Sequence, residues 1–177
     1  MKTRQLAMDS VLAAMCAALG ALALDFNSIK ITLESFPVLL GALLFGPLDG
    51  MAIGFVGTLL YQLLRYGVSA TTLLWILPYV ISGLLVGLYA RKRDFRLSLK
   101  ETVFIALVSE LLTTALNTGV MYVDARLYGY YFKGFITAML LPRIGVSVAK
   151  GLVFGSIAPK LLEAVRKLAL KGTTPNH

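Results

Sequence analysis

Apolar residues run along most of this chain, and the polar positions between them divide it into six segments. Each segment holds enough apolar residues to cross a bilayer, or nearly enough if neighbouring helices shield it. Gly46, Pro47 and Gly50 separate the second segment from the third, and Gly129 falls between the fifth and the sixth. The pattern predicts an all-α integral membrane protein, a six-transmembrane-helix bundle in one domain over residues 1–177. The expected helices cover approximately residues 5–24, 33–46, 49–65, 72–90, 100–122 and 134–168.

Charge is scarce and unevenly placed along the chain. The chain is 58% hydrophobic and 15% charged, whereas a soluble domain carries about 25% charged residues. The net charge of +8 comes from cations spread over several short segments, so we expect no nucleic-acid partner and interpret them as topology signals. With the N-terminus inside, most of the cations fall on the inner side: Lys2, Arg4, Arg91, Lys92, Arg93, Arg96, Lys100, Lys160, Arg166, Lys167 and Lys171. We therefore predict a multi-pass protein of the cell membrane with both termini in the cytoplasm.

Two of the expected helices carry polar residues at a spacing of two turns. Arg143 and Lys150 are seven residues apart in the sixth helix, and Glu110 and Asn117 are seven residues apart in the fifth. Each pair therefore lies on one face of its helix. If the two helices are antiparallel neighbours, a rise of about 1.5 Å per residue places Asn117 near Arg143 and Glu110 near Lys150.

These depths give the two cations different interpretations. Lys150 either forms a structural ion pair with Glu110, or faces a ligand while Glu110 pairs elsewhere. Arg143 has no carboxylate at its depth on the fifth helix, and an unpaired guanidinium is costly to bury. It is expected to face a wet cavity or an anionic ligand, since its planar fork suits a carboxylate. The alternatives are a pair with Glu34 and hydrogen bonds to carbonyls freed by Pro142.

Aromatic residues gather on the predicted outer side. Tyr61 and Arg65 are four residues apart near the end of the third helix, and Trp75 and Tyr79 are four apart in the fourth, beside Pro78. A flat ligand that stacks on these rings is one interpretation. Core packing and an interfacial aromatic belt are the others.

The sequence lacks the common motifs for ATP binding and for metal binding. The chain has no GxxxxGK[ST] loop for ATP, no HExxH or DxxD metal motif, and its one histidine is the last residue. We therefore expect no enzyme activity, no metal and no cofactor.

In the first helix Ala13, Ala17 and Ala21 stand four residues apart. Small residues at this spacing allow close helix approach in lipid, either within the bundle or against a partner protein.

The run FPVLLGALLFGPLDGMAIGFVGTLLYQLL, with its small residues from Pro37 to Gly57, resembles the substrate-binding S components of energy-coupling factor (ECF) transporters. The stretches LNTGVMYVDARLYGYY and LLPRIGVSVAKGL are most similar to the folate-binding branch. The resemblance implies high-affinity vitamin binding from outside, and delivery with a transmembrane coupling protein and two ATPases. The partners would hydrolyse ATP, and the alanine motif at Ala13, Ala17 and Ala21 would dock on the coupling protein.

The resemblance also implies a site in the outer half, built from the fourth to sixth helices and closed by the loops DFNSIKITLES and RYGVSATT. Folate would place its pterin among Trp75, Tyr79 and Asn117, with a carboxylate near Arg143 or Arg65. The loop RYGVSATTLLW lacks the prolines and most aromatics usual in the folate branch, so riboflavin, thiamine or hydroxymethylpyrimidine, and pantothenate stay open. A membrane scaffold and a membrane-embedded enzyme are the alternatives from other classes.

Overall fold

The structure, a computed structural model, describes residues 2–26 and 29–171. The side chains described are those of 3–23, 31–134 and 140–165. Within these residues the chain forms the elements α1 (Lys2–Ala21), β1 (Leu24–Phe26), β2 (Ile29–Ile31), α2 (Ser35–Phe45), α3 (Pro47–Tyr66), α4 (Thr72–Lys92), α5 (Leu99–Leu127) and α6 (Phe135–Lys171). All six expected helices are present and lie close to their expected bounds. The largest difference is at the end of α5, which continues five residues beyond position 122.

A short antiparallel hairpin occupies a segment that was expected to be loop. Strand β1 pairs with β2 in the register Leu24↔Ile31, Asp25↔Lys30 and Phe26↔Ile29. Each strand has three residues, which is too short for the alternation of apolar and polar positions to reveal it in the sequence. The hairpin brings the chain from the end of α1 to Thr32 and Glu34, just before α2.

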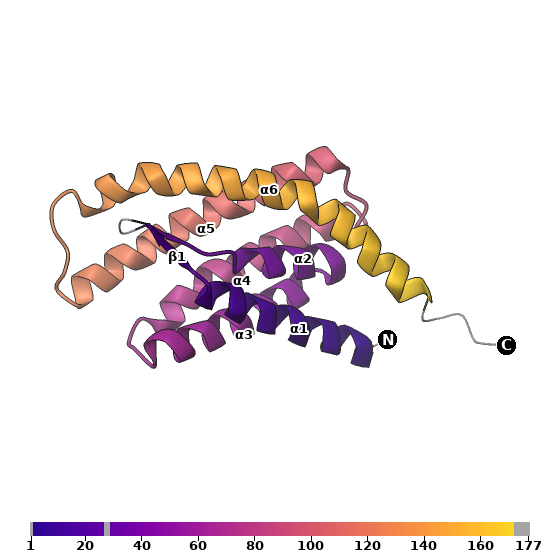
Figure 1. Cartoon of the computed structure of the whole chain (residues 1–177), viewed down its shortest axis with the longest axis horizontal. Coiled ribbons are helices and arrows are strands. Elements are labelled where there is room, and N and C mark those ends of the chain that lie inside the picture. The colour runs from indigo at the N-terminus through magenta and orange to yellow at the C-terminus, as the bar shows by residue number, and fades with distance from the viewer. Residues whose placement is uncertain (1, 27–28, 172–177) are drawn as a thin grey trace.

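The helices pack as two connected groups (Figure 1). α3 packs against α1, α2 and α4, while α6 lies along α5, and α4 joins the groups by its contact with α5. The hydrophobic core between them includes Cys16, Val38, Leu43, Ile53, Val86, Ala106 and Phe154. The termini of the described chain lie at one end of the long axis, and the α3–α4 and α5–α6 loops lie at the other.

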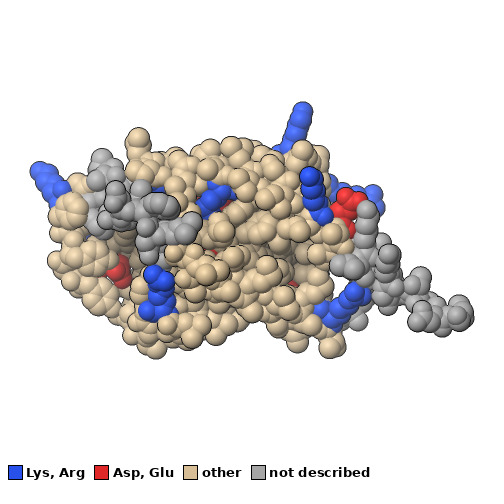
Figure 2. All heavy atoms as spheres, viewed as in Figure 1, with Lys and Arg blue, Asp and Glu red and all other residues tan. Residues whose placement is uncertain are grey.

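The flank of the molecule between these ends is poor in charge. Figure 2 shows most Lys and Arg side chains towards the two ends of the long axis, with a largely uncharged surface between them. In the part of the chain that the structure describes, four helical segments are long and apolar enough to cross a membrane: Pro47–Tyr66, Thr72–Lys92, Leu99–Leu127 and Leu140–Val165. α2 has 11 residues, which is about 16 Å of helix and too short to cross a bilayer by itself. Most of its residues are buried by the neighbouring helices, as expected for so short a segment. α1 has 20 residues but is not among these four segments.

Glycines set the sharp α2–α3 corner and the close approach of α3 to α4. Gly46 has a backbone φ of +109°, which residues other than glycine rarely adopt. Pro47 follows it in the first turn of α3. A Cβ on Gly54 would lie 2.8 Å from the Tyr79 carbonyl oxygen, and one on Gly83 would lie 2.5 Å from the Gly50 carbonyl carbon. The small residues of the Pro37–Gly57 run therefore allow backbone to pack against backbone.

The three alanines proposed for partner docking do not share one exposed face. Ala13 is 5% exposed and Ala17 is 8% exposed, and a Cβ on Gly57 would lie 2.9 Å from the Ala13 carbonyl oxygen. Both alanines are therefore buried within the bundle, Ala13 against α3, while Ala21 is exposed. Ala13 and Ala17 are therefore not accessible to a partner in this structure, because the close contact made by small residues here is internal. The small residues that α1 exposes are Ala7, Ser10, Ala14, Ala18 and Ala21.

Candidate functional site

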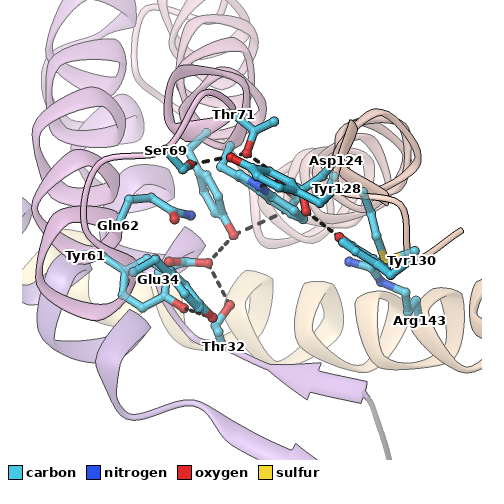
Figure 3. Close-up of a pocket in the computed structure, with 15 residues that line it drawn as sticks. Thr32, Glu34, Tyr61, Gln62, Ser69, Thr71, Asp124, Tyr128, Tyr130 and Arg143 are labelled. Atoms are coloured by element: carbon cyan, nitrogen blue, oxygen red, sulfur yellow. Dashed lines mark hydrogen bonds between the residues drawn. The ribbon is translucent and has the colours of Figure 1, made fainter. Parts of the chain in front are cut away.

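A cavity of about 450 Å³ lies where the end of α3, the start of α4, the end of α5 and α6 come together. This volume is within the range of about 300–1,000 Å³ that small-molecule sites occupy. Figure 3 shows Thr32, Glu34 and Tyr61 on one side of it and Asp124, Tyr128 and Tyr130 on the other. The lining consists of Thr32, Glu34, Tyr61, Gln62, Tyr66, Ser69, Thr71, Trp75, Tyr79, Asn117, Met121, Asp124, Tyr128, Tyr130 and Arg143.

Glu34 supplies a buried carboxylate to one wall of the cavity. It precedes the first residue of α2 and is 4% exposed. Its Oε1 accepts hydrogen bonds from the hydroxyls of Tyr79 and Thr32, the latter at 2.9 Å. The Asn117 amide in turn donates to the Tyr79 hydroxyl at 3.4 Å. This network joins α2, α4 and α5 across the floor of the cavity.

Asp124 supplies a second carboxylate, at the opposite wall. Its Oδ1 accepts from Thr71 Oγ1 at 2.5 Å and from the Trp75 indole nitrogen at 3.4 Å, and its Oδ2 accepts from the Tyr130 hydroxyl. Partial burial, and then the hydrogen bond and the negative charge of Asp124, raise the pKa of Tyr130 to about 12. Asp124 therefore ties the start of α4 and the α5–α6 loop to α5.

Arg143 brings a guanidinium to the same cavity from α6. It donates to the Met121 sulfur at 3.1 Å, which is its one hydrogen bond among the side chains that the structure describes. A thioether is a weak acceptor, while a guanidinium carries five N–H donors. Most of the hydrogen-bonding capacity of this partly buried cation is therefore available to a ligand.

A smaller cavity of about 50 Å³ adjoins the first, and the two share Thr32, Tyr79, Asn117 and Arg143 in their linings. Lys150 lines the smaller cavity and forms a 2.8 Å ion pair with Glu110. Its ammonium also donates to Ser35 Oγ at 3.1 Å. Glu110 is 3% exposed, so this is a buried ion pair that links α5, α6 and α2.

A sequence model of the family described as "ECF transporter, substrate-specific component" matches residues 4–165. The chain belongs to this family. The family consists of transporter components, so this substrate-specific component is an integral membrane protein of a transport system and not an enzyme.

Comparison of folds agrees with the family. The substrate-specific component superposes on a crystal structure of FolT bound with folic acid with a TM-score of 0.67, at 21% identity, over 92% of each chain. It superposes on the S component of a bacterial ECF transporter with a TM-score of 0.65, at 22% identity, over 98% of this chain and 100% of the other. At these identities the likeness establishes the shared fold.

The curated relatives found by sequence match only a segment of the chain. A UPF0397 protein from each of two strains of Streptococcus thermophilus is 33% identical over 69 residues, which is 39% of this substrate-specific component. The matched segment spans 37% of the length of those relatives.

The structure brings together five of the seven residues that the sequence suggested for ligand binding. These five line the larger cavity of the substrate-specific component: Tyr61, Trp75, Tyr79, Asn117 and Arg143. Lys150 lines the smaller cavity instead, with Glu110 as its partner. Arg65 lines neither cavity. Its side chain is exposed and donates to the Ala21 carbonyl oxygen at 3.4 Å, towards the end of α1.

The sequence interpretation missed the two carboxylates of the larger cavity. Glu34 was considered only as a partner for Arg143, and Asp124 was not considered. Asp124 lies seven residues after Asn117, as Asn117 lies seven after Glu110, so the polar face of α5 continues for two further turns. Extending that spacing would have found Asp124, whereas Glu34 lies at a helix start that no periodicity marks.

Proposed function

We propose that the chain is the substrate-binding subunit of an ECF vitamin importer in the cell membrane, and that its ligand is folate. The observation that carries the proposal is the composition of the larger cavity. It combines two carboxylates, aromatic rings and a guanidinium whose one hydrogen bond among the described side chains is to a sulfur atom. Folate carries a counterpart for each of these groups.

The pairing of groups is specific. The amino-oxo-pyrimidine ring of a pterin presents adjacent N–H donors, which suit a carboxylate such as Glu34 or Asp124. The flat ring suits the aromatic surfaces of Trp75 and Tyr79. The glutamate tail of folate brings carboxylates that suit the planar fork of Arg143. The fold shared with FolT, whose structure contains folic acid, supports the same ligand class.

The proposed partners are a transmembrane coupling protein and two ATPase subunits, which would supply ATP hydrolysis. In this account α1 meets the coupling protein by its exposed face. Ala14, Ala18 and Ala21 are exposed there at spacings of four and three residues, so they lie on one side of the helix. Larger apolar side chains flank them, with Val11 60% exposed and Met15 42% exposed. Such a face allows close helix packing in lipid.

One observation favours a second candidate ligand. Among the described side chains that line the larger cavity, two carboxylates face one guanidinium. An aminopyrimidine vitamin, such as thiamine or hydroxymethylpyrimidine, offers N–H donors without an acidic tail. Such a ligand would use Glu34 and Asp124 and leave Arg143 without an anionic partner.

An uptake assay tests the proposal. A folate-requiring bacterial strain without its own importer would express this chain with or without an ECF coupling protein and its ATPases. We expect growth on nanomolar folate when all subunits are present, and no growth when either this chain or the ATPases are omitted. Growth on thiamine or hydroxymethylpyrimidine instead, in matched requiring strains, would favour the second candidate. Absence of any vitamin-dependent growth would contradict the importer function.

A further inference from the structure

The smaller cavity lies between the two cations of α6 and is not needed to hold a heterocycle. We infer that it is an anion subsite, which receives a carboxylate group of the ligand while the rest of the molecule stays in the larger cavity. The inference rests on the proposed function, in that the larger cavity must bind a small molecule. It adds that the acidic end of this molecule enters the smaller cavity, between Arg143 and Lys150, and does not stay in the larger one.

The balance of charge around the smaller cavity favours an anion. Its described ionisable lining groups are Arg143, Lys150, Glu110 and Tyr79. Glu110 is held by Lys150 at 2.8 Å, so that carboxylate is already neutralised. The guanidinium of Arg143 has no carboxylate within ion-pair distance among the described side chains. The described lining of the smaller cavity therefore carries one net positive charge, whereas Glu34 and Asp124, the two carboxylates that share the larger cavity with Arg143, do not line the smaller one.

Hydrogen-bonding groups of the cavity are also left without partners. Thr113 is 4% exposed, lines the cavity, and its hydroxyl has no hydrogen-bond partner among the described residues. The Asn117 amide nitrogen makes one long bond of 3.4 Å and keeps a second N–H donor, whereas its unpaired oxygen is an acceptor that a carboxylate does not satisfy. Buried polar groups are ordinarily satisfied, and a carboxylate can accept from a hydroxyl, an amide N–H and a guanidinium at once.

The size and position of the cavity suit one small group of a larger molecule. Its volume of about 50 Å³ is one to two times the roughly 30 Å³ that a water molecule occupies in the liquid. A carboxylate group fits this space, which is about a ninth of the volume of the larger cavity. Because Asn117 and Arg143 line both cavities, a ligand can span them, with its acid between the α6 cations and its N–H donors facing Glu34 or Asp124.

Calorimetric titration of acid and amide pairs tests the subsite on the full chain in detergent. The probes are folic acid against its diamide, and pantothenate against pantothenamide. We expect one acid to bind about 10- to 150-fold more tightly than its amide, because a charge-assisted hydrogen bond contributes about 1.5–3 kcal/mol. Arg143→Gln should reduce that preference to a few-fold. Thr113→Val keeps the side-chain shape and should reduce the preference for the acid about tenfold. This variant tests the subsite if Arg143→Gln does not fold. Lys92→Gln, the same charge change on an exposed residue at the end of α4, should leave the preference unchanged.

The outcomes separate this inference from the folate proposal. An acid preference for pantothenate alone, lost in Arg143→Gln, would support the subsite and contradict folate as the ligand. Equal binding of folic acid and its diamide would overturn the subsite and leave the folate proposal standing. Binding of uncharged or cationic vitamins alone, or no binding of either acid, would overturn the subsite. An acid preference that both Arg143→Gln and Thr113→Val retain would also overturn it.

Discussion

The two cations of α6 share a face but differ in what surrounds them. Lys150 has a carboxylate partner at 2.8 Å and a hydroxyl acceptor at 3.1 Å. Arg143 has a thioether at 3.1 Å. The first arrangement is a closed set of bonds that holds helices together, whereas the second leaves donors directed at a cavity. Burial alone therefore does not decide the role of a charged residue in a membrane helix.

The ion pair of Lys150 with Glu110 leads to a stability prediction. Lys150→Met would leave the Glu110 carboxylate buried without its partner, and breaking a buried pair in this way costs about 3–5 kcal/mol. We expect a lower midpoint of thermal unfolding in detergent, followed by circular dichroism. Adding Glu110→Gln should recover most of the loss, because no uncompensated charge then remains. A single variant as stable as the double variant would contradict the account of this pair.

The hydrogen bond from Tyr130 to Asp124 leads to a prediction about pH. The raised pKa of about 12 exceeds the ordinary tyrosine value of about 10. The stabilisation that this bond gives the α5–α6 loop is therefore complete below about pH 10 and is lost as the pH rises through about 12. The difference in tyrosinate absorbance between wild type and Tyr130→Phe should show a group that titrates near pH 12. A difference that titrates near pH 10 would contradict the contact.

Spacing could predict some residue contacts and not others. Glu110 with Lys150, and Asn117 near Arg143, follow from helix rise on antiparallel neighbours, and the structure confirms both. Contacts made by segment ends do not follow from any period. Tyr79 and Glu34 are 45 positions apart in the sequence, and Thr71 and Asp124 are 53 apart. Their meeting depends on how loops and helix ends are placed, which only tertiary packing sets.

At the scale of elements, α1 has one face for the bundle and another for a partner. Ala17 packs inside and Ala18, the next residue, is exposed. The two faces predict opposite effects of the same substitution. Ala18→Leu should leave ligand binding and stability unchanged and abolish uptake, because the coupling protein can no longer approach closely. Ala17→Leu should lower stability by about 1–3 kcal/mol through overpacking.

Binding to the purified chain and uptake by the complete transporter measure these two effects separately. Uptake retained in Ala18→Leu would show that the exposed face of α1 is not the docking surface. Full stability of Ala17→Leu would show that α1 is placed incorrectly against α3.

The contact of α3 with α4 depends on glycine, which gives a prediction with a matched control. A Cβ on Gly83 would lie 2.5 Å from the Gly50 carbonyl carbon, so Gly83→Ala must push the two helices apart. We expect it to cost at least about 1–3 kcal/mol of stability in detergent. A Cβ on Gly145 in α6 would meet no atom within 4 Å among the described residues. Gly145→Ala should therefore be neutral or stabilise the helix by up to about 1 kcal/mol. Equal effects of the two substitutions would contradict the close α3–α4 approach.

Element bounds were predictable where turn residues mark them. Gly46 and Pro47 fix the α2–α3 corner, and the α2 and α3 bounds lie within two residues of expectation. The end of α5 was placed too early, because Val123 to Leu127 mix polar and apolar residues and were interpreted as loop. The extra turn carries Asp124, so an error in one helix end also removed a residue from the candidate site.

At the scale of the whole molecule, the larger cavity lies at the end away from the described termini. Its lining comes from the α3–α4 loop, the end of α5 and the residues before α2, which lie opposite the start of α1 and the end of α6 in Figure 1. If both termini are cytoplasmic, as the positive charges predict, the cavity faces the outside. A vitamin could then be captured without ATP, and delivery would require the partner subunits.

The central claim is that the larger cavity binds a vitamin in contact with its aromatic wall. Trp75 is the one tryptophan of the chain and lines that cavity, so its fluorescence reports on the site directly. We would titrate the purified protein in detergent, without ATP or partners, with folate, riboflavin, thiamine and pantothenate in turn. The account predicts saturable quenching by folate at nanomolar concentration. No response to any of the four vitamins would contradict it.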